Sequence, residues 1–136
     1  MPELKVEEDR QIAQELYTAD TSKIHVFALV IVSPSFNINQ ATFDVISYNI
    51  DNFTNKNYRT EGTLVDNKFI LITVAGFVDY RTALEYYNGF LVEKYVRNPS
   101  GAKMYSFLIN NENLLILKND KNPERYNIFF LEKYLK

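Results

Sequence analysis

The chain has 136 residues, of which 46% are hydrophobic and 15% aromatic, and its formal net charge at pH 7 is −2. This length and composition suit one domain with a substantial core, and the charge excludes the basic surface that nucleic acid or an acidic membrane requires. Cysteine is absent and His25 is the only histidine, which excludes disulfides, thiol catalysis and clusters of histidine ligands around a metal. The longest apolar run, Val26–Val32, is too short to span a bilayer.

The N-terminal segment, residues 1–22, is polar and is expected to be either a linker or a short helix around Glu8–Tyr17. The next segment, Lys23–Ser33, is apolar at both alternating sets of positions. This pattern predicts a central strand that is covered on both faces. The strand is expected to stop at Pro34, because proline cannot donate to a strand ladder.

A helix is expected at Asn39–Asn52, with Asn37 or Asn39 as its N-cap. Its apolar residues form two rows, one around Ala41 and Val45 and a second, partly adjacent row. The second row consists of Phe43, Ile46, Ile50 and Phe53. The many Asn, Ser and Asp residues lower its helix propensity, so packing must hold this helix in place.

Two strands are expected next. Tyr58–Val65 alternates weakly and carries several polar residues, which suits the edge of a sheet. Asp66 and Asn67 form a two-residue turn signal, so this strand is expected to pair as a hairpin with the following one. That strand, Lys68–Phe77, is apolar at both sets of positions, like the first strand.

A second helix is expected at Tyr80–Arg97, after the N-cap residue Asp79. Its aromatic residues are too many to point at one core. Most are expected to pack internally, and the remainder to contact a partner, since tyrosine and phenylalanine are enriched at interface cores. The candidate contact residues are Tyr86, Phe90 and Tyr95 on this helix and Phe27 and Ile31 on the first strand.

The remaining chain is expected to form a strand at Ala102–Asn110, a short helix at Glu112–Lys118 and a last helix that begins after Asn122. An aromatic row on the last helix should dock on the body of the domain. It contains Tyr126, Phe129, Phe130 and Tyr134.

The order of these elements is β-α-β-β-α-β followed by two helices. It predicts one α+β domain over residues 23–136, a ferredoxin-like sandwich with the antiparallel sheet order 4-1-3-2. The two most apolar strands take the central positions in this order, so pattern and topology agree. The first two helices cover one face. The other face must be covered by the C-terminal helices, the N-terminal segment or a partner chain.

The residues predict no catalytic group, no metal site and no cofactor, and therefore no enzyme. A lone His25 on an apolar strand is interpreted as structural. Asp79 and Glu85 are interpreted as a helix cap and a solvated helix position rather than as paired carboxylates. Acylphosphatases share the fold plan, but the corner after the first strand, Ser33–Asn37, lacks the arginine of their phosphate loop.

The stretch ITVAGFVDYRTALEYYN, residues 72–88, resembles the second half of the SPOR domain, a peptidoglycan-binding module of envelope proteins. In that module a strand ends in Val-Gly-Pro-Phe and a helix then begins with an alanine-centred motif. Here Val74–Phe77 stands in the first position, with Ala75 and Gly76 in place of Gly-Pro, and Arg81–Ala83 stands in the second. The resemblance implies peptidoglycan as an alternative partner.

A second resemblance covers nearly the whole chain from Ile24. The segments HVFALVIV, NINQATFDVISYNIDNF, ILITVAGFVDYRTALEYYNGF, FLINNENLLIL and FFLEKYL resemble the C-terminal domain of large tetratricopeptide-repeat lipoproteins. Those envelope proteins are associated with type IX secretion and gliding motility. The resemblance implies a non-catalytic assembly module with envelope protein partners, located in the periplasm within a lipoprotein anchored to the outer membrane.

Overall fold

The computed structural model describes residues 2–93 and 96–135. Within them the chain forms five helices and four strands. In chain order these are α1 (Pro2–Leu16), β1 (His25–Val32), α2 (Ile38–Asn52), β2 (Arg59–Val65), β3 (Phe69–Ala75), α3 (Tyr80–Glu93), β4 (Lys103–Asn110), α4 (Asn111–Asp120) and α5 (Pro123–Lys133).

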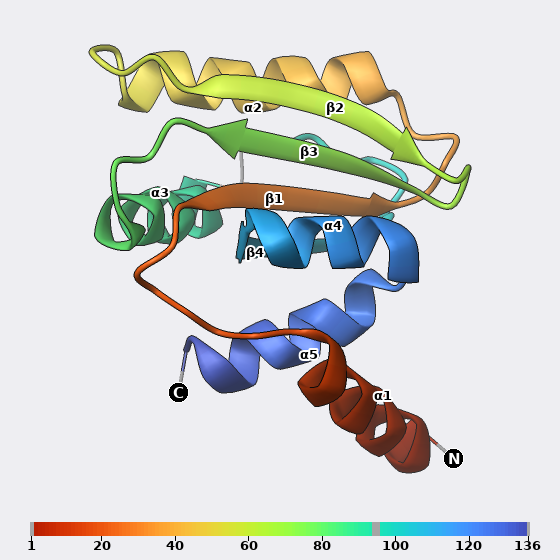
Figure 1. Ribbon diagram of the computed structural model, residues 1–136. Coiled ribbons are helices and arrows are strands. Elements are labelled where there is room, and N and C mark those ends of the chain that lie inside the picture. Colours follow the sequence, from red (N-terminus) through yellow and green to blue (C-terminus); the bar gives the residue numbers. More distant parts are fainter. Residues whose placement is uncertain (1, 94–95, 136) are drawn as a thin grey trace.

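The four strands form one antiparallel sheet in the order β2-β3-β1-β4, which confirms the predicted ferredoxin-like arrangement. The helices α2 and α3 lie on one face of this sheet and α4 lies on the other (Figure 1). The central strands are covered on both faces, and Val30 and Ile72 are fully buried. The extra C-terminal helices are also present, as expected.

Asparagine side chains cap the N-termini of three of the helices. Asn37 accepts a hydrogen bond from the backbone N–H of Gln40 at 3.0 Å and so caps α2. Asn110 and Asn122 cap α4 and α5 in the same way. The caps compensate for the low helix propensity of the Asn-rich segments, because each satisfies a backbone donor that has no partner inside its helix.

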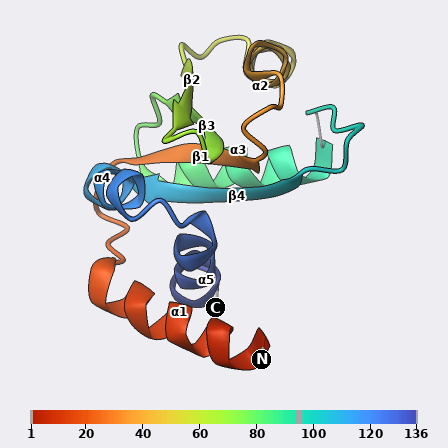
Figure 2. The same ribbon diagram turned by 90° about the vertical axis from the view of Figure 1, so that its right-hand side faces the viewer.

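The helix α4 covers the second face of the sheet, and α5 lies along the edge formed by β4 (Figures 1 and 2). Leu117 on α4 is fully buried, and the Lys121 ammonium lies 3.3 Å from the Asp66 carboxylate at the β2–β3 turn. The helix α5 packs against β4, where the Tyr126 hydroxyl donates to the Leu108 carbonyl at 2.6 Å. The aromatic row of the last helix therefore docks on the domain, with Phe130 fully buried.

The N-terminal segment forms α1, which is longer than the helix expected around Glu8–Tyr17 and lies beside α5 (Figure 2). The Tyr17 and Tyr126 rings meet edge to face with centroids 4.9 Å apart. The Arg125 guanidinium contacts the buried Asp9 carboxylate at 2.9 Å. Packing against α5 thus stabilises a helix in a segment for which the polar sequence was compatible with either a linker or a short helix.

The second predicted helix is shorter than expected. The helix α3 ends at Glu93 in the described chain, and Arg97 lies outside any helix. The backbone N–H of Arg97 instead has a partner on another element, since it donates to the Asp44 carboxylate on α2 at 3.1 Å. The strand β3 also ends early, at Ala75, because Gly76 takes a backbone φ of 119° that strands do not adopt.

Candidate functional site

The residues predicted to contact a partner are core residues in this structure. Phe27, Ile31 and Tyr86 are fully buried and Phe90 is 5% exposed, while Tyr95 lies outside the described residues. The Phe27 ring packs against Tyr86 and Phe90 with centroids 5.0 and 4.7 Å apart. Because the aromatic side of α3 faces the sheet, these four side chains fill the interior and offer no contact surface.

Tyr86 keeps its hydroxyl satisfied inside the core. It donates to the side-chain oxygen of Asn49 on α2, and the Asn49 amide donates to the Thr60 hydroxyl on β2 at 3.0 Å. Burial raises the pKa of Tyr86 well above its usual value. The chain of bonds runs from α3 through α2 to β2 and fixes α2 over the edge strand.

His25 has a structural environment. It is buried, one ring nitrogen lies 2.8 Å from the Lys23 carbonyl, and the other lies 2.9 Å from the Tyr134 hydroxyl. Burial lowers the pKa of His25, which favours the neutral ring. The histidine therefore joins the start of β1 to the end of α5 and does not face an open cleft.

The acidic residues considered for chemistry also have local roles. Asp79 accepts hydrogen bonds from the backbone N–H and the hydroxyl of Thr82, at 2.8 and 2.7 Å, and so caps α3. Glu85 lies 3.8 Å from Arg81 on the exposed side of the same helix. Among the described residues, no group of three or more His, Asp or Glu side chains is placed to hold a metal ion.

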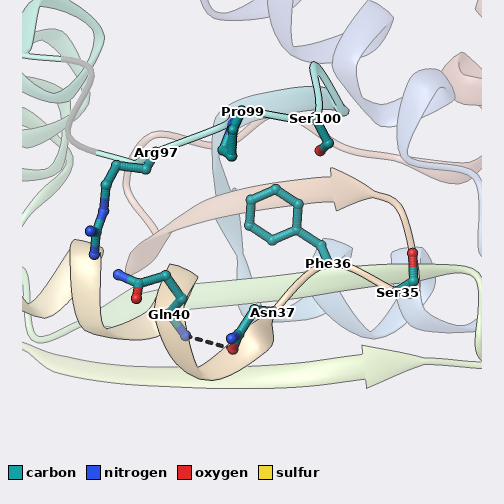
Figure 3. Close-up of a pocket in the computed structure, with 7 residues that line it drawn as sticks. All are labelled: Ser35, Phe36, Asn37, Gln40, Arg97, Pro99 and Ser100. Carbon is teal, nitrogen blue, oxygen red and sulfur yellow. Dashed lines mark hydrogen bonds between the residues drawn. The ribbon is translucent and has the colours of Figure 1, made fainter.

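A pocket of about 360 Å³ lies at the corner between β1 and α2. Phe36 points into it from the β1–α2 connection, and Pro99 faces this ring from the connection between α3 and β4 (Figure 3). The Asn37 and Gln40 side chains and the Arg97 guanidinium lie along its rim. The pocket thus combines an apolar floor with a few polar groups.

Arg97 forms an ion pair with Asp44 on α2. Its guanidinium lies 2.9 Å from the Asp44 carboxylate, which is buried and also accepts from the Gln40 amide at 2.8 Å. A paired arginine has little charge left for an anionic ligand, and no nucleophile lies beside a base among the lining residues. This corner joins α2 to the α3–β4 connection and suggests no reaction.

A groove of about 320 Å³ lies between α2 and the edge strand β2. Three of its lining residues, Ile46, Asn49 and Ile50, belong to α2. The other lining residues lie between α2 and β2 or on β2 itself, and they are Phe53, Thr54, Lys56, Tyr58 and Thr60. Two of the lining residues, Asn49 and Thr60, are joined by the hydrogen bond between α2 and β2. The lining of the groove is mainly apolar and includes the charged residue Lys56.

Beside the groove, α2 exposes an apolar row. Phe43, Ile46 and Ile50 are 60%, 37% and 61% exposed, while Ala41 and Val45 on the other side of the helix are fully buried. The sequence showed both rows but not which of them faces solvent. The presence of a second apolar row was the feature of the sequence that could have indicated an exposed apolar surface, because one sheet face cannot cover two sides of a helix.

No helix in the described part of the chain is long and apolar enough to cross a membrane. Comparison of the chain with protein-family models, with curated proteins and with solved structures found no match.

Proposed function

We propose that this domain is a non-catalytic protein–protein interaction module that binds its partner through α2 and the sheet edge beside it. The observation that carries this proposal is the exposed apolar row formed by Phe43, Ile46 and Ile50. Burying one side chain of this size in an interface is worth about 1.5–3 kcal/mol. Three such side chains on one helix face, next to an apolar groove, have the character of a contact surface.

The proposal includes a location and a class of partner. The resemblance to the tetratricopeptide-repeat lipoproteins places such a module in the periplasm, within a lipoprotein anchored to the outer membrane and associated with type IX secretion or gliding motility. The partners are then other envelope proteins. The support for this location is the sequence resemblance alone.

A peptidoglycan-binding module of the SPOR type is the alternative. A glycan-binding sheet face needs exposed polar groups beside its stacking surface. In the described residues both faces of β1 are covered. Phe27 packs against Phe90 of α3, and by alternation Leu29 and Ile31 are buried on this same face, while Val26, Ala28 and Val30 are buried on the opposite face. This covering favours a protein partner over a glycan.

The test of the proposed function is site-specific photo-crosslinking in living cells that express the intact protein. A photoreactive residue is placed at Phe43 or Ile50, and the matched control carries it at Leu115, which is 64% exposed on α4. The proposal expects one discrete protein product, shared by the two α2 positions and absent from the control.

Two outcomes would contradict the proposal. Identical products from all three positions would show random collision, and no product from either α2 position would show that this row contacts no protein. A pull-down with purified peptidoglycan, including glycan strands stripped of their stem peptides, tests the alternative. Retention of the purified domain on stripped glycan would favour the SPOR-type reading.

A further inference from the structure

The strand β2 has an open edge. It is the outermost strand of the sheet and pairs with β3 alone in the part of the chain that is described. In an antiparallel strand, every second residue directs its N–H and C=O groups away from its neighbour. The outer side of β2 therefore presents a row of backbone donors and acceptors that an added strand would satisfy.

The helix α2 reaches over this open edge (Figures 1 and 2). It lies very close to β2, because a Cβ atom at Gly62 would come within 2.5 Å of the Thr42 hydroxyl oxygen. A helix is about 10 Å wide and adjacent strands lie about 4.8 Å apart, so one helix covers about two strands. A strand added beside β2 would thus lie under α2, where Ile46 and Ile50 line the groove together with Thr60 of β2.

We propose that an extended segment of a partner protein docks here and adds to the sheet as an antiparallel strand beside β2. This inference rests on the proposed function and specifies its partner. The backbone edge sets the extended conformation of the segment, and the groove under α2 receives its apolar side chains. Strand addition of this kind draws affinity from main-chain hydrogen bonds and specificity from alternate side chains.

The two faces of β2 define the side-chain pattern of the partner. Thr60 and Gly62 face α2, as the Asn49–Thr60 bond and the close approach at Gly62 show. By alternation, Arg59 and Glu61 lie on the opposite face, where both are exposed. The partner strand therefore alternates apolar residues toward α2 with a basic residue opposite Glu61 and an acidic residue opposite Arg59.

Strand direction orders these charges. In an antiparallel pair the partner runs from Glu61 toward Arg59, so its basic residue precedes its acidic residue by two positions. A suitable probe is the blocked peptide Thr-Val-Lys-Val-Glu-Val-Thr, with valines toward α2. Its matched control is Thr-Val-Glu-Val-Lys-Val-Thr, which has the same composition and reversed charges.

A second copy of this chain does not fit the same edge. Pairing β2 with its own copy about a two-fold axis would place both α2 helices on the same sheet face, over two strands that are about 4.8 Å apart. Each helix already reaches over its strand edge, and two helices need about 8–10 Å between their axes. The two copies of α2 would collide, which favours a partner strand without its own covering helix.

The test is peptide binding to the whole chain, measured by calorimetry and by hydrogen exchange. We expect the Lys-first peptide to bind and to protect backbone amides within residues 59–65. Two further versions carry N-methyl groups on alternate amides, one version for each set. The version methylated on the amides that face β2 should bind roughly tenfold more weakly than the parent peptide or worse, because it loses strand hydrogen bonds and keeps the side chains; the other version should keep its binding. Glu61→Lys should reverse the preference between the two charge orders.

The outcomes separate this inference from the proposed function. Equal binding of both N-methylated peptides and the parent peptide, or no binding of any peptide at millimolar concentration, would overturn strand addition. A preference for the Glu-first peptide by the unmodified chain would overturn the antiparallel direction. In each of these cases a crosslink from Phe43 or Ile50 would still support a protein contact on α2, whereas the absence of a product from both positions would count against the proposed function.

Discussion

Replacement of Phe130 by alanine should strongly destabilise the domain. Phe130 on α5 is fully buried, and its ring centroid lies 5.3 Å from that of Tyr87 on α3 and 6.3 Å from that of Phe107 on β4. It also stacks on Tyr134 at 5.3 Å. The truncation of a buried phenylalanine costs about 3–5 kcal/mol, because transfer free energy is lost and a cavity remains. The total stability of a domain is about 5–15 kcal/mol.

The measurement is urea unfolding of the whole chain, followed by circular dichroism. Phe130→Ala should lower the midpoint without a change of slope, since the surface exposed on unfolding stays nearly the same. The matched control is Leu131→Ala, the next residue on α5, which is 43% exposed and should cost less than about 1 kcal/mol. Equal midpoints for Phe130→Ala and the unmodified chain would refute the reasoning, because they would show that α5 is an appendage rather than part of the core.

Three further perturbations test other contacts. Burial lowers the pKa of His25, so the unfolded state binds the proton more tightly, and stability should be full above about pH 6.5 and fall as the pH drops below it. Thermal melts of His25→Gln should lack this step, and a step of the same size in this variant would show that another group causes it. Gly62→Val should cost about 1–3 kcal/mol in chemical unfolding, because its side chain meets Thr42; an unchanged midpoint would show that α2 is not tightly seated. Arg125→Met should cost about 3–5 kcal/mol at neutral pH, because it leaves the buried Asp9 carboxylate uncompensated, and a melting temperature equal to that of Lys133→Met would contradict this.

The sheet could be predicted from the sequence because its information is local. The central strands β1 and β3 are apolar on both alternating sets of positions, and only a strand covered on both faces tolerates that pattern. The handedness rule then leaves few strand orders for a β-α-β-β-α-β chain. Turn residues such as Asp66 and Asn67, both with positive φ, fixed the hairpin.

The candidate site could be predicted only in part. The sequence pattern identified the row of Phe43, Ile46 and Ile50, but the same residues would suit a core as well as a surface. The tyrosines of α3 gave the opposite error, since Tyr86 was expected at a contact surface and is fully buried. Its hydroxyl is satisfied by Asn49 on another helix, and such a partner is visible only once the helices are packed.

The sequence by itself determined the elements from β1 onward, their order and the position of the two central strands, because apolar periodicity and caps act over a few residues. Only the tertiary structure decided which side of α2 stays exposed, that α4 covers the second sheet face, and that α1 is ordered by α5. These features depend on contacts between residues far apart in the chain, such as Lys121 with Asp66 and Asp9 with Arg125. No local pattern encodes such pairs, since each partner alone has the composition of an ordinary solvated surface.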